Sequence, residues 1–110
     1  MKERQALSAF AALSQETRLR ILRVLVVAGD EGLSAGLIAE RVGVSASNVS
    51  FHLKEMEAAG LISARRQGRS IIYAADHGTL ADLIRFLLED CCSGRLDTCL
   101  PAPTESTPPA

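Results

Sequence analysis

The sequence lacks the features that define several large classes of protein. No apolar run approaches the ~20 residues that a membrane-spanning helix requires. There is no internal repeat, no paired acid and base and no phosphate-binding loop, and 110 residues are few for an enzyme with a deep pocket. These absences predict a single small domain that is not an enzyme and does not enter a membrane.

A large net charge of one sign is also missing, since the chain carries only −1 at pH 7. The charge is unevenly distributed: residues 1–75 hold ten Lys and Arg against seven Asp and Glu, whereas residues 76–110 hold two against six. Binding to phosphates depends on a local basic face rather than on the total charge. We therefore expect any DNA-binding surface in the first part of the chain, with the acidic end pointing away.

Most of the functional information lies in the stretch VSASNVSFHLKEMEAAG, residues 44–60. Ser45 is placed to cap a helix, with valines at the staple positions on either side, and Gly60 is placed to end it. We expect an apolar face made of Val49, His52, Leu53 and Met56 and an opposite face made of Ser47, Phe51, Lys54 and Ala58.

A second capped helix precedes this one, over about residues 35–41, with Ser34 as its cap and Gly43 in the turn between the two. Two capped helices joined by a tight turn with glycine form a helix-turn-helix, whose second helix enters the major groove. An ordinary helical hairpin fits these two helices equally well.

The segment after Gly60 favours the DNA-binding interpretation. Residues 61–75 predict two short strands around a turn at Gln67–Gly68, with Arg65, Arg66 and Arg69 at the tip. A basic hairpin behind a recognition helix is typical of a wing that contacts phosphates or the minor groove. We predict a mainly α fold with a small β-hairpin, a winged helix-turn-helix that forms dimers.

Three further helices complete the predicted domain, which spans residues 1–90. Leu7, Phe10 and Leu13 space the first, and the core stripe of the second is predicted to be Leu19, Leu22, Leu25 and Val26. The last helix runs from about Gly78 to Asp90. We expect it to form the dimer interface with the first helix, through Leu7, Phe10, Leu80, Leu83, Ile84 and Leu87, because one module has a small footprint on DNA.

The chain has only three cysteines, Cys91, Cys92 and Cys99, directly after the last helix. The beginning of the chain superficially resembles a signal peptide, but its apolar part is short and continues a helical pattern, so we expect a cytoplasmic protein. In that compartment cysteines favour metal or redox chemistry over disulfides. Residues 91–99 are thus predicted to hold a soft ion, and residues 100–110 to be a disordered tail.

Three thiolates suit trivalent arsenic or antimony, lead, cadmium or monovalent copper. Structural zinc normally has four ligands, and a fourth would have to be His77, Asp90 or Asp97. Nucleophilic catalysis is disfavoured, because the helix C-terminus and the nearby carboxylates raise a thiol pKa.

The chain resembles the ArsR/SmtB family of winged-helix repressors from about Phe10 to Leu88. LSQETRLRIL at 13–22 is similar to the start of the family's second helix, SASNVSFHLKEME at 45–57 to its recognition helix, and RRQGRSIIY at 65–73 to its wing. Phe51 departs from the pattern, since many relatives have a polar residue there.

The position of the cysteines resembles one branch of that family. Residues 34–42 lack the paired cysteines of the founding arsenic sensors, and zinc-type sites match poorly because only Asp82, Glu89 and Asp90 are present. The tail instead resembles arsenic-responsive repressors whose cysteines follow the last helix.

This resemblance implies a homodimeric repressor that binds double-stranded operator DNA and releases it when arsenite, or antimony, binds to Cys91, Cys92 and Cys99. The implied DNA contacts are Ser45, Ser47, Asn48, Ser50, Phe51 and Lys54 on the helix and Arg65, Arg66 and Arg69 on the wing. A thiol redox switch, a cadmium- or lead-responsive repressor and a small metal-carrying protein stay open as alternatives. No organic cofactor is expected.

Overall fold

The computed structural model describes residues 1–89, which fold into helices and one small sheet. The elements in chain order are α1 (Glu3–Leu13), α2 (Glu16–Ala28), the 3-10 helix η1 (Gly29–Glu31), β1 (Leu33–Ser34), α3 (Ala35–Val42), α4 (Ala46–Ala58), β2 (Ile62–Gln67), β3 (Ser70–Ala75) and α5 (His77–Leu87). The predicted fold class, mainly α with a small β-hairpin, is confirmed. The predictions for Cys91, Cys92 and Cys99 and for the tail lie outside the described residues. The last helix ends at Leu87, three residues before the predicted end at Asp90.

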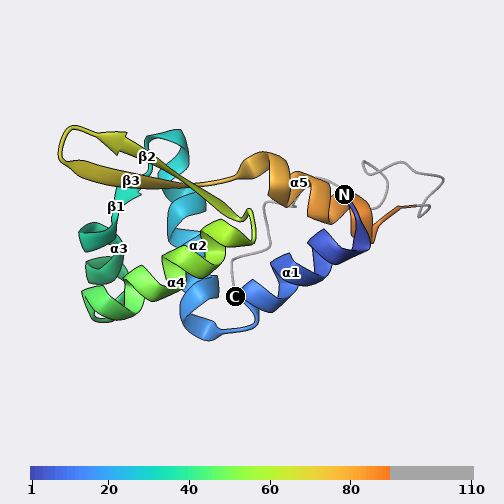
Figure 1. The fold of residues 1–110 in the computed structure, drawn as a ribbon, viewed down its shortest axis with the longest axis horizontal. Coiled ribbons are helices and arrows are strands. Elements are labelled where there is room, and N and C mark those ends of the chain that lie inside the picture. Colours follow the sequence, from blue (N-terminus) through green and yellow to red (C-terminus); the bar gives the residue numbers. More distant parts are fainter. Residues whose placement is uncertain (90–110) are drawn as a thin grey trace, which may run out of the picture.

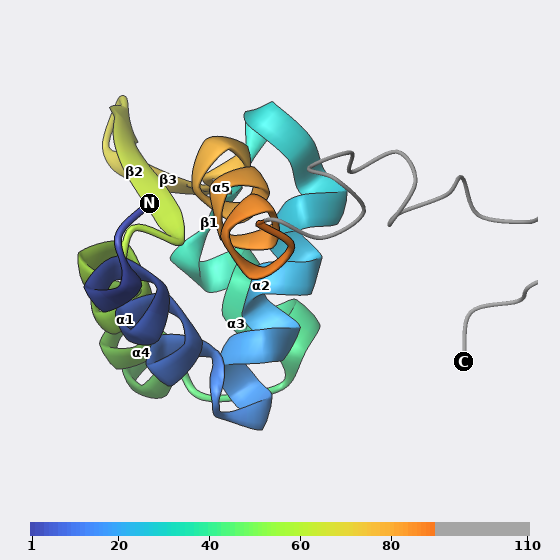
Figure 2. The same ribbon diagram turned by 90° about the vertical axis from the view of Figure 1, so that its right-hand side faces the viewer.

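The core lies where α2, α3 and α4 meet the base of the sheet (Figure 1). Its fully buried side chains are Ile21, Leu25, Ile38, Val49, Leu53, Met56 and Leu61. Figures 1 and 2 place α1 and α5 at the end of the molecule away from the hairpin tip. None of the helices in residues 1–89 combines the length and apolar character that crossing a membrane would need.

The core stripe of α2 was partly mispredicted. Leu22 and Leu25 are buried as expected, but Leu19 and Val26 are exposed and Ile21 is fully buried in their place. At ~100° per residue, Leu19 and Val26 lie more than a third of a turn around the helix from Ile21. The apolar character of α2 extends around most of its circumference, so the sequence pattern alone did not identify the inward face.

Helix α1 packs against the domain through small side chains. Ala6, Ala9 and Ala12 are buried, Leu13 is half-buried, and the larger Leu7 and Phe10 point outward. Because alanine is small, α1 packs closely against the domain along its alanine face. Its largest apolar side chains do not lie on that face and are left uncovered within one chain.

The sheet has three antiparallel strands in the order β1-β3-β2, and the sequence predicted only two of them. β1 pairs Leu33 with Tyr73 and Ser34 with Ile72. Gly32 enters this strand at φ +69°, and a Cβ there would lie 2.4 Å from the carbonyl oxygen of Tyr73. Two residues are too few to show strand periodicity, which is why β1 was missed.

Candidate nucleic-acid interface

Side-chain caps define the helix-turn-helix. The Ser34 hydroxyl accepts a hydrogen bond from the Leu37 N–H at 3.3 Å, and the Ser45 hydroxyl accepts one from the Asn48 N–H, also at 3.3 Å. Between the two helices Gly43 adopts φ +79°, and its N–H donates to the Ala39 carbonyl at 2.8 Å. These contacts satisfy backbone groups at both helix ends and fix the turn. The predicted caps and turn are confirmed.

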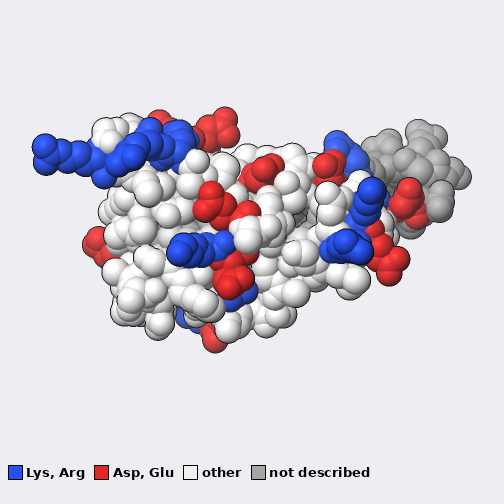
Figure 3. Space-filling model, in the orientation of Figure 1, with Lys and Arg blue, Asp and Glu red and all other residues white. Residues whose placement is uncertain are grey.

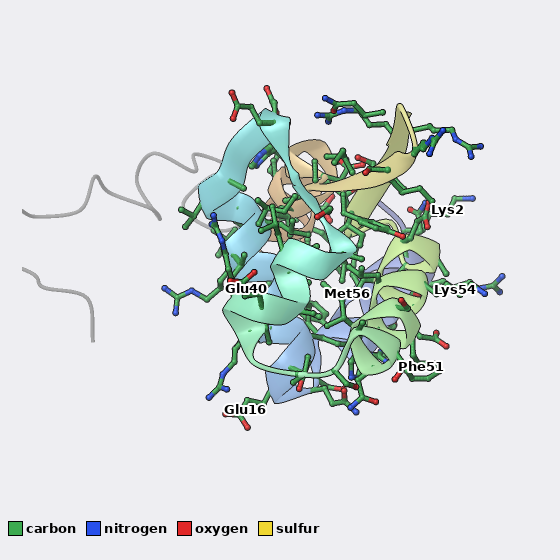
Figure 4. The ribbon with its side chains drawn as sticks, turned by 90° about the vertical axis from the view of Figure 1, so that its left-hand side faces the viewer. Lys2, Glu16, Glu40, Phe51, Lys54 and Met56 are labelled. Carbon is green, nitrogen blue, oxygen red and sulfur yellow. The ribbon has the colours of Figure 1, made fainter. Side chains whose placement is uncertain are left out.

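Helix α4 has the two faces that its sequence predicts. Val49, Leu53 and Met56 are buried, and His52 is half-buried. The outward side chains are Ser45, Ser47, Asn48, Ser50, Phe51, Lys54 and Ala58, all exposed. Figure 4 shows Phe51 and Lys54 projecting from α4 into solvent while Met56 points into the core. All the predicted α4 contacts are thus accessible, although the Ser45 hydroxyl already caps the helix.

Arg18 of α2 joins the recognition helix at Phe51 and His52. Its Nε–H donates to Nδ1 of His52 at 3.0 Å, and its guanidinium carbon lies 5.8 Å from the centre of the Phe51 ring. The rings of Phe51 and His52 meet edge to face, with their centres 5.6 Å apart. No local sequence pattern indicates a role for Arg18, because its hydrogen-bond partner His52 lies 34 positions away in sequence.

The hydrogen bond from Arg18 requires His52 to be neutral at Nδ1, so its proton is on Nε2. Burial, and secondly the positive charge of Arg18, lower the pKa of His52 below its ordinary value of 6.5. The ring is therefore held in the uncharged form near neutral pH. The neutral His52 ring supports the position of Arg18 and adds no positive charge to the exposed face of α4.

The wing is the hairpin β2–β3, and its tip differs from the prediction by one residue. Gln67 pairs with Ser70, so the turn consists of Gly68 and Arg69 rather than Gln67 and Gly68. After Ile62 every residue of β2 is exposed, which shows that the hairpin projects from the domain. Figure 3 shows basic side chains along this hairpin, whereas the middle of the same face carries both signs of charge.

The prediction that Arg65 lies at the tip of the hairpin is wrong. Arg65 pairs with Ile72 within the hairpin, and its guanidinium donates to the carbonyl oxygens of Asp30 at 2.9 Å and Glu31 at 2.7 Å. These bonds join the wing to η1. Arg66 and Arg69 are exposed, and Arg66 faces the opposite side of the strand from Arg65.

The residues predicted for the dimer interface divide into two groups. Leu7 is 62% exposed and Leu87 57% exposed, and Phe10 and Ile84 also point outward. Leu83, by contrast, is only 5% exposed and belongs to the core of its own chain, against which Leu80 also packs. α1 and α5 thus each leave large apolar side chains uncovered, Leu7 and Phe10 on α1 and Ile84 and Leu87 on α5.

No group of three or more His, Cys, Asp or Glu side chains comes together in a metal-binding arrangement within residues 1–89. The predicted metal ligands Cys91, Cys92 and Cys99 lie outside that range.

A fold of this kind, with a capped helix-turn-helix and a basic hairpin behind it, defines a winged helix-turn-helix DNA-binding domain. Residues 13–64 match a family model described as a helix-turn-helix domain. The chain is 41% identical to the uncharacterized HTH-type transcriptional regulator YceK of Bacillus subtilis, over 56% of this chain and 60% of that one.

Two further relatives are matched over most of their length. The chain is 35% identical to the probable mercury resistance operon repressor of Streptomyces lividans, over 87% of this chain and 76% of that protein. It is also similar to the solved structure of an ArsR-like transcriptional regulator from Rhodococcus sp. RHA1, with a TM-score of 0.68, 38% identity and 76% of each chain covered. The chain belongs to the ArsR/SmtB family of winged-helix transcriptional repressors.

Proposed function

We propose that the protein is a homodimeric cytoplasmic repressor whose operator complex is released when trivalent arsenic, or antimony, binds to Cys91, Cys92 and Cys99. The observation that carries the proposal is the sequence CC-x6-C, which begins four residues after the end of α5. Its position couples a thiol cluster to the helix that offers the uncovered apolar surface. In this proposal, binding of the ion causes α4 and the wing to release the DNA.

A dimer is supported by the surface formed by Leu7, Phe10, Ile84 and Leu87. Such large apolar side chains gain free energy when a second copy covers them, and a symmetric dimer brings the same patch from each subunit together. Two recognition helices can then contact half-sites about 34 Å apart. The wing adds phosphate contacts to each half-site.

Release by arsenic is supported by ligand chemistry and by the position of the cysteines in the sequence. Thiolates are the ligands that soft ions prefer, and three of them suit trivalent arsenic. Drawing Cys99 toward Cys91 and Cys92 changes the chain directly behind α5, and a small rotation there alters the spacing of the recognition helices. A coupling free energy of about 1–3 kcal/mol weakens DNA binding about 5- to 150-fold.

Two alternatives use the same cysteines. In a thiol redox switch, Cys99 forms a disulfide with Cys91 or Cys92. Another soft ion, cadmium, lead or mercury, is the second alternative, and mercury enters because the Streptomyces lividans relative is named for it.

One experiment separates these possibilities. A labelled duplex, selected by the full-length protein from random sequence, is titrated in parallel with arsenite, antimonite, zinc, cadmium, lead, mercury and a thiol oxidant. We expect arsenite and antimonite to release the DNA at the lowest concentrations. Release by the oxidant alone would support the redox switch, release by another ion would reassign the sensor, and a protein that selects no duplex would contradict the repressor assignment.

A further inference from the structure

Phe51 is chemically out of place on the outward face of α4. The exposed side chains one turn away on α4, Ser47, Asn48, Lys54 and Glu55, are polar or charged, whereas Phe51 presents a phenyl ring that is 58% exposed. The exposed part of an apolar ring in that position gains no free energy from its own fold. It gains free energy only when a ligand covers it.

The ring is held in place by its neighbours. Arg18 lies 5.8 Å from its centre, and the edge-to-face contact with His52 restricts it from another side. Arg18 is in turn fixed by the 3.0 Å hydrogen bond to His52. A side chain restrained before binding loses less conformational entropy when it binds, so this arrangement suits specific recognition.

The chemistry of the major groove identifies what such a ring can contact. Adenine, guanine and cytosine present hydrogen-bond donors and acceptors there, whereas thymine adds a C5-methyl group. That methyl is the apolar feature of the base edges, and phenylalanine is among the side chains that contact it. Serine and asparagine on the same face remain available for polar edges.

We propose that Phe51 reads the C5-methyl group of a thymine in each half-site, and that Arg18 is the positioning residue that holds the ring for this contact. The inference rests on the proposed DNA-binding function and deepens it by naming the base that is recognised. It assigns a role to Arg18, which does not need to touch the base.

The test removes only the methyl group. Duplexes selected from random sequence by the full-length protein are resynthesised with deoxyuridine in place of each thymidine in turn, and their dissociation constants are measured. Covering one methyl is worth about fourfold in affinity, so replacement in both half-sites should weaken wild-type binding roughly fifteenfold. The loss of affinity should be concentrated at one pair of symmetry-related thymines.

Variants then locate the contact. Phe51→Ala should bind the thymine and uracil duplexes equally well, whereas the matched control Val27→Ala, which removes an exposed apolar side chain lining the groove between α2 and α3, should keep the wild-type ratio. Arg18→Met loses a positive charge, which weakens binding to both duplexes alike. If Arg18 positions the ring, the thymine-to-uracil ratio should also fall.

The outcomes distinguish a failure of the Phe51 inference from a failure of the proposed function. A protein that selects DNA but shows no loss at any uracil, or a Phe51→Ala variant with the wild-type ratio, overturns this inference and leaves the repressor function intact. An Arg18→Met variant that keeps the full ratio overturns the role given to Arg18. If no duplex is selected at all, both the proposed function and the inference fail.

Discussion

His52 shows how one half-buried side chain ties the recognition helix to the rest of the domain. Its Nδ1 accepts from Arg18, and this bond exists only while the ring is neutral, because a protonated imidazole has no acceptor. Burial and the charge of Arg18 both oppose protonation and lower the pKa of His52. The contact between α2 and α4 therefore depends on pH.

The sign of this dependence follows from the lowered pKa. The unfolded chain takes up a proton at His52 near pH 6.5, before the folded chain does, so acidification below that value favours unfolding. The stabilisation is present in full above pH 6.5 and decreases as the pH falls toward the folded-state pKa. Denaturant unfolding between about pH 5 and about pH 8 should show this loss, and His52→Gln, which keeps an acceptor for Arg18, should show a smaller one. Equal slopes for the two proteins would show that His52 is not responsible.

At the scale of elements, local signals predicted most of the fold. Ser34, Ser45 and the turn at Gly43 identified α3 and α4. The spacing of apolar and polar residues identified the face of α4 that carries the candidate contacts. Two of the missed features are non-local. β1 forms because Leu33 and Ser34 meet β3 about forty residues later, and Arg65 reaches η1 across 35 positions. No local pattern encodes such contacts.

The anchoring of Arg65 changes what is expected of the wing. Arg66→Ala and Arg69→Ala should each reduce the slope of log affinity against log salt by about one unit, because we expect each exposed guanidinium to contact one phosphate. Arg65→Ala is the matched control within the same hairpin. It should change the slope less, since two of its N–H groups bind the carbonyls of Asp30 and Glu31. A slope that is unchanged in the Arg66→Ala, Arg69→Ala double variant would show that the wing does not contact DNA.

At the scale of the whole molecule, the fold separates the two candidate interaction surfaces. The wing and the N-terminal end of α4 lie toward one end of the molecule, and helices α1 and α5 lie toward the other (Figure 1). The sequence analysis predicted the second surface on α1 and α5, where Leu7, Phe10, Ile84 and Leu87 are exposed, but that prediction included Leu83, which the chain buries by itself. The apolar stripe of α5 is wide enough to pack against its own core and also to face a partner. The periodicity of the sequence does not distinguish the residues of the core from those that a partner would cover.

Leu87 tests the dimer surface because it is exposed within one chain. Leu87→Glu leaves the isolated subunit intact but would bury an unpaired carboxylate in a dimer, so the variant should sediment as a folded monomer and bind the duplex much more weakly. Val27→Glu is the matched control, since Val27 is 85% exposed but lines a groove between α2 and α3. The control should remain dimeric. A dimeric Leu87→Glu variant with normal DNA affinity would assign the α5 surface to another role.

The coupling between the cysteines and the DNA is tested most sharply by Cys99→Ser. A hydroxyl is a poor ligand for trivalent arsenic, and this change leaves Cys91 and Cys92 intact while it removes the third thiolate of the proposed site. The substitution lies outside α4 and the wing, so the variant should fold and bind the duplex like the wild type. Inorganic arsenite should no longer release it.

Methylated arsenite supplies the matched ligand for this variant, because it has two exchangeable positions and two thiolates can hold it. The Cys99→Ser variant should therefore bind methylated arsenite through Cys91 and Cys92 while its response to inorganic arsenite is lost. Release is measured by fluorescence anisotropy of the labelled duplex, with both arsenicals titrated against wild type and variant. If inorganic arsenite releases Cys99→Ser and the wild type at the same concentration, the three-thiolate sensor is wrong. The adjacent pair of cysteines, without loop closure, would then have to transmit the signal.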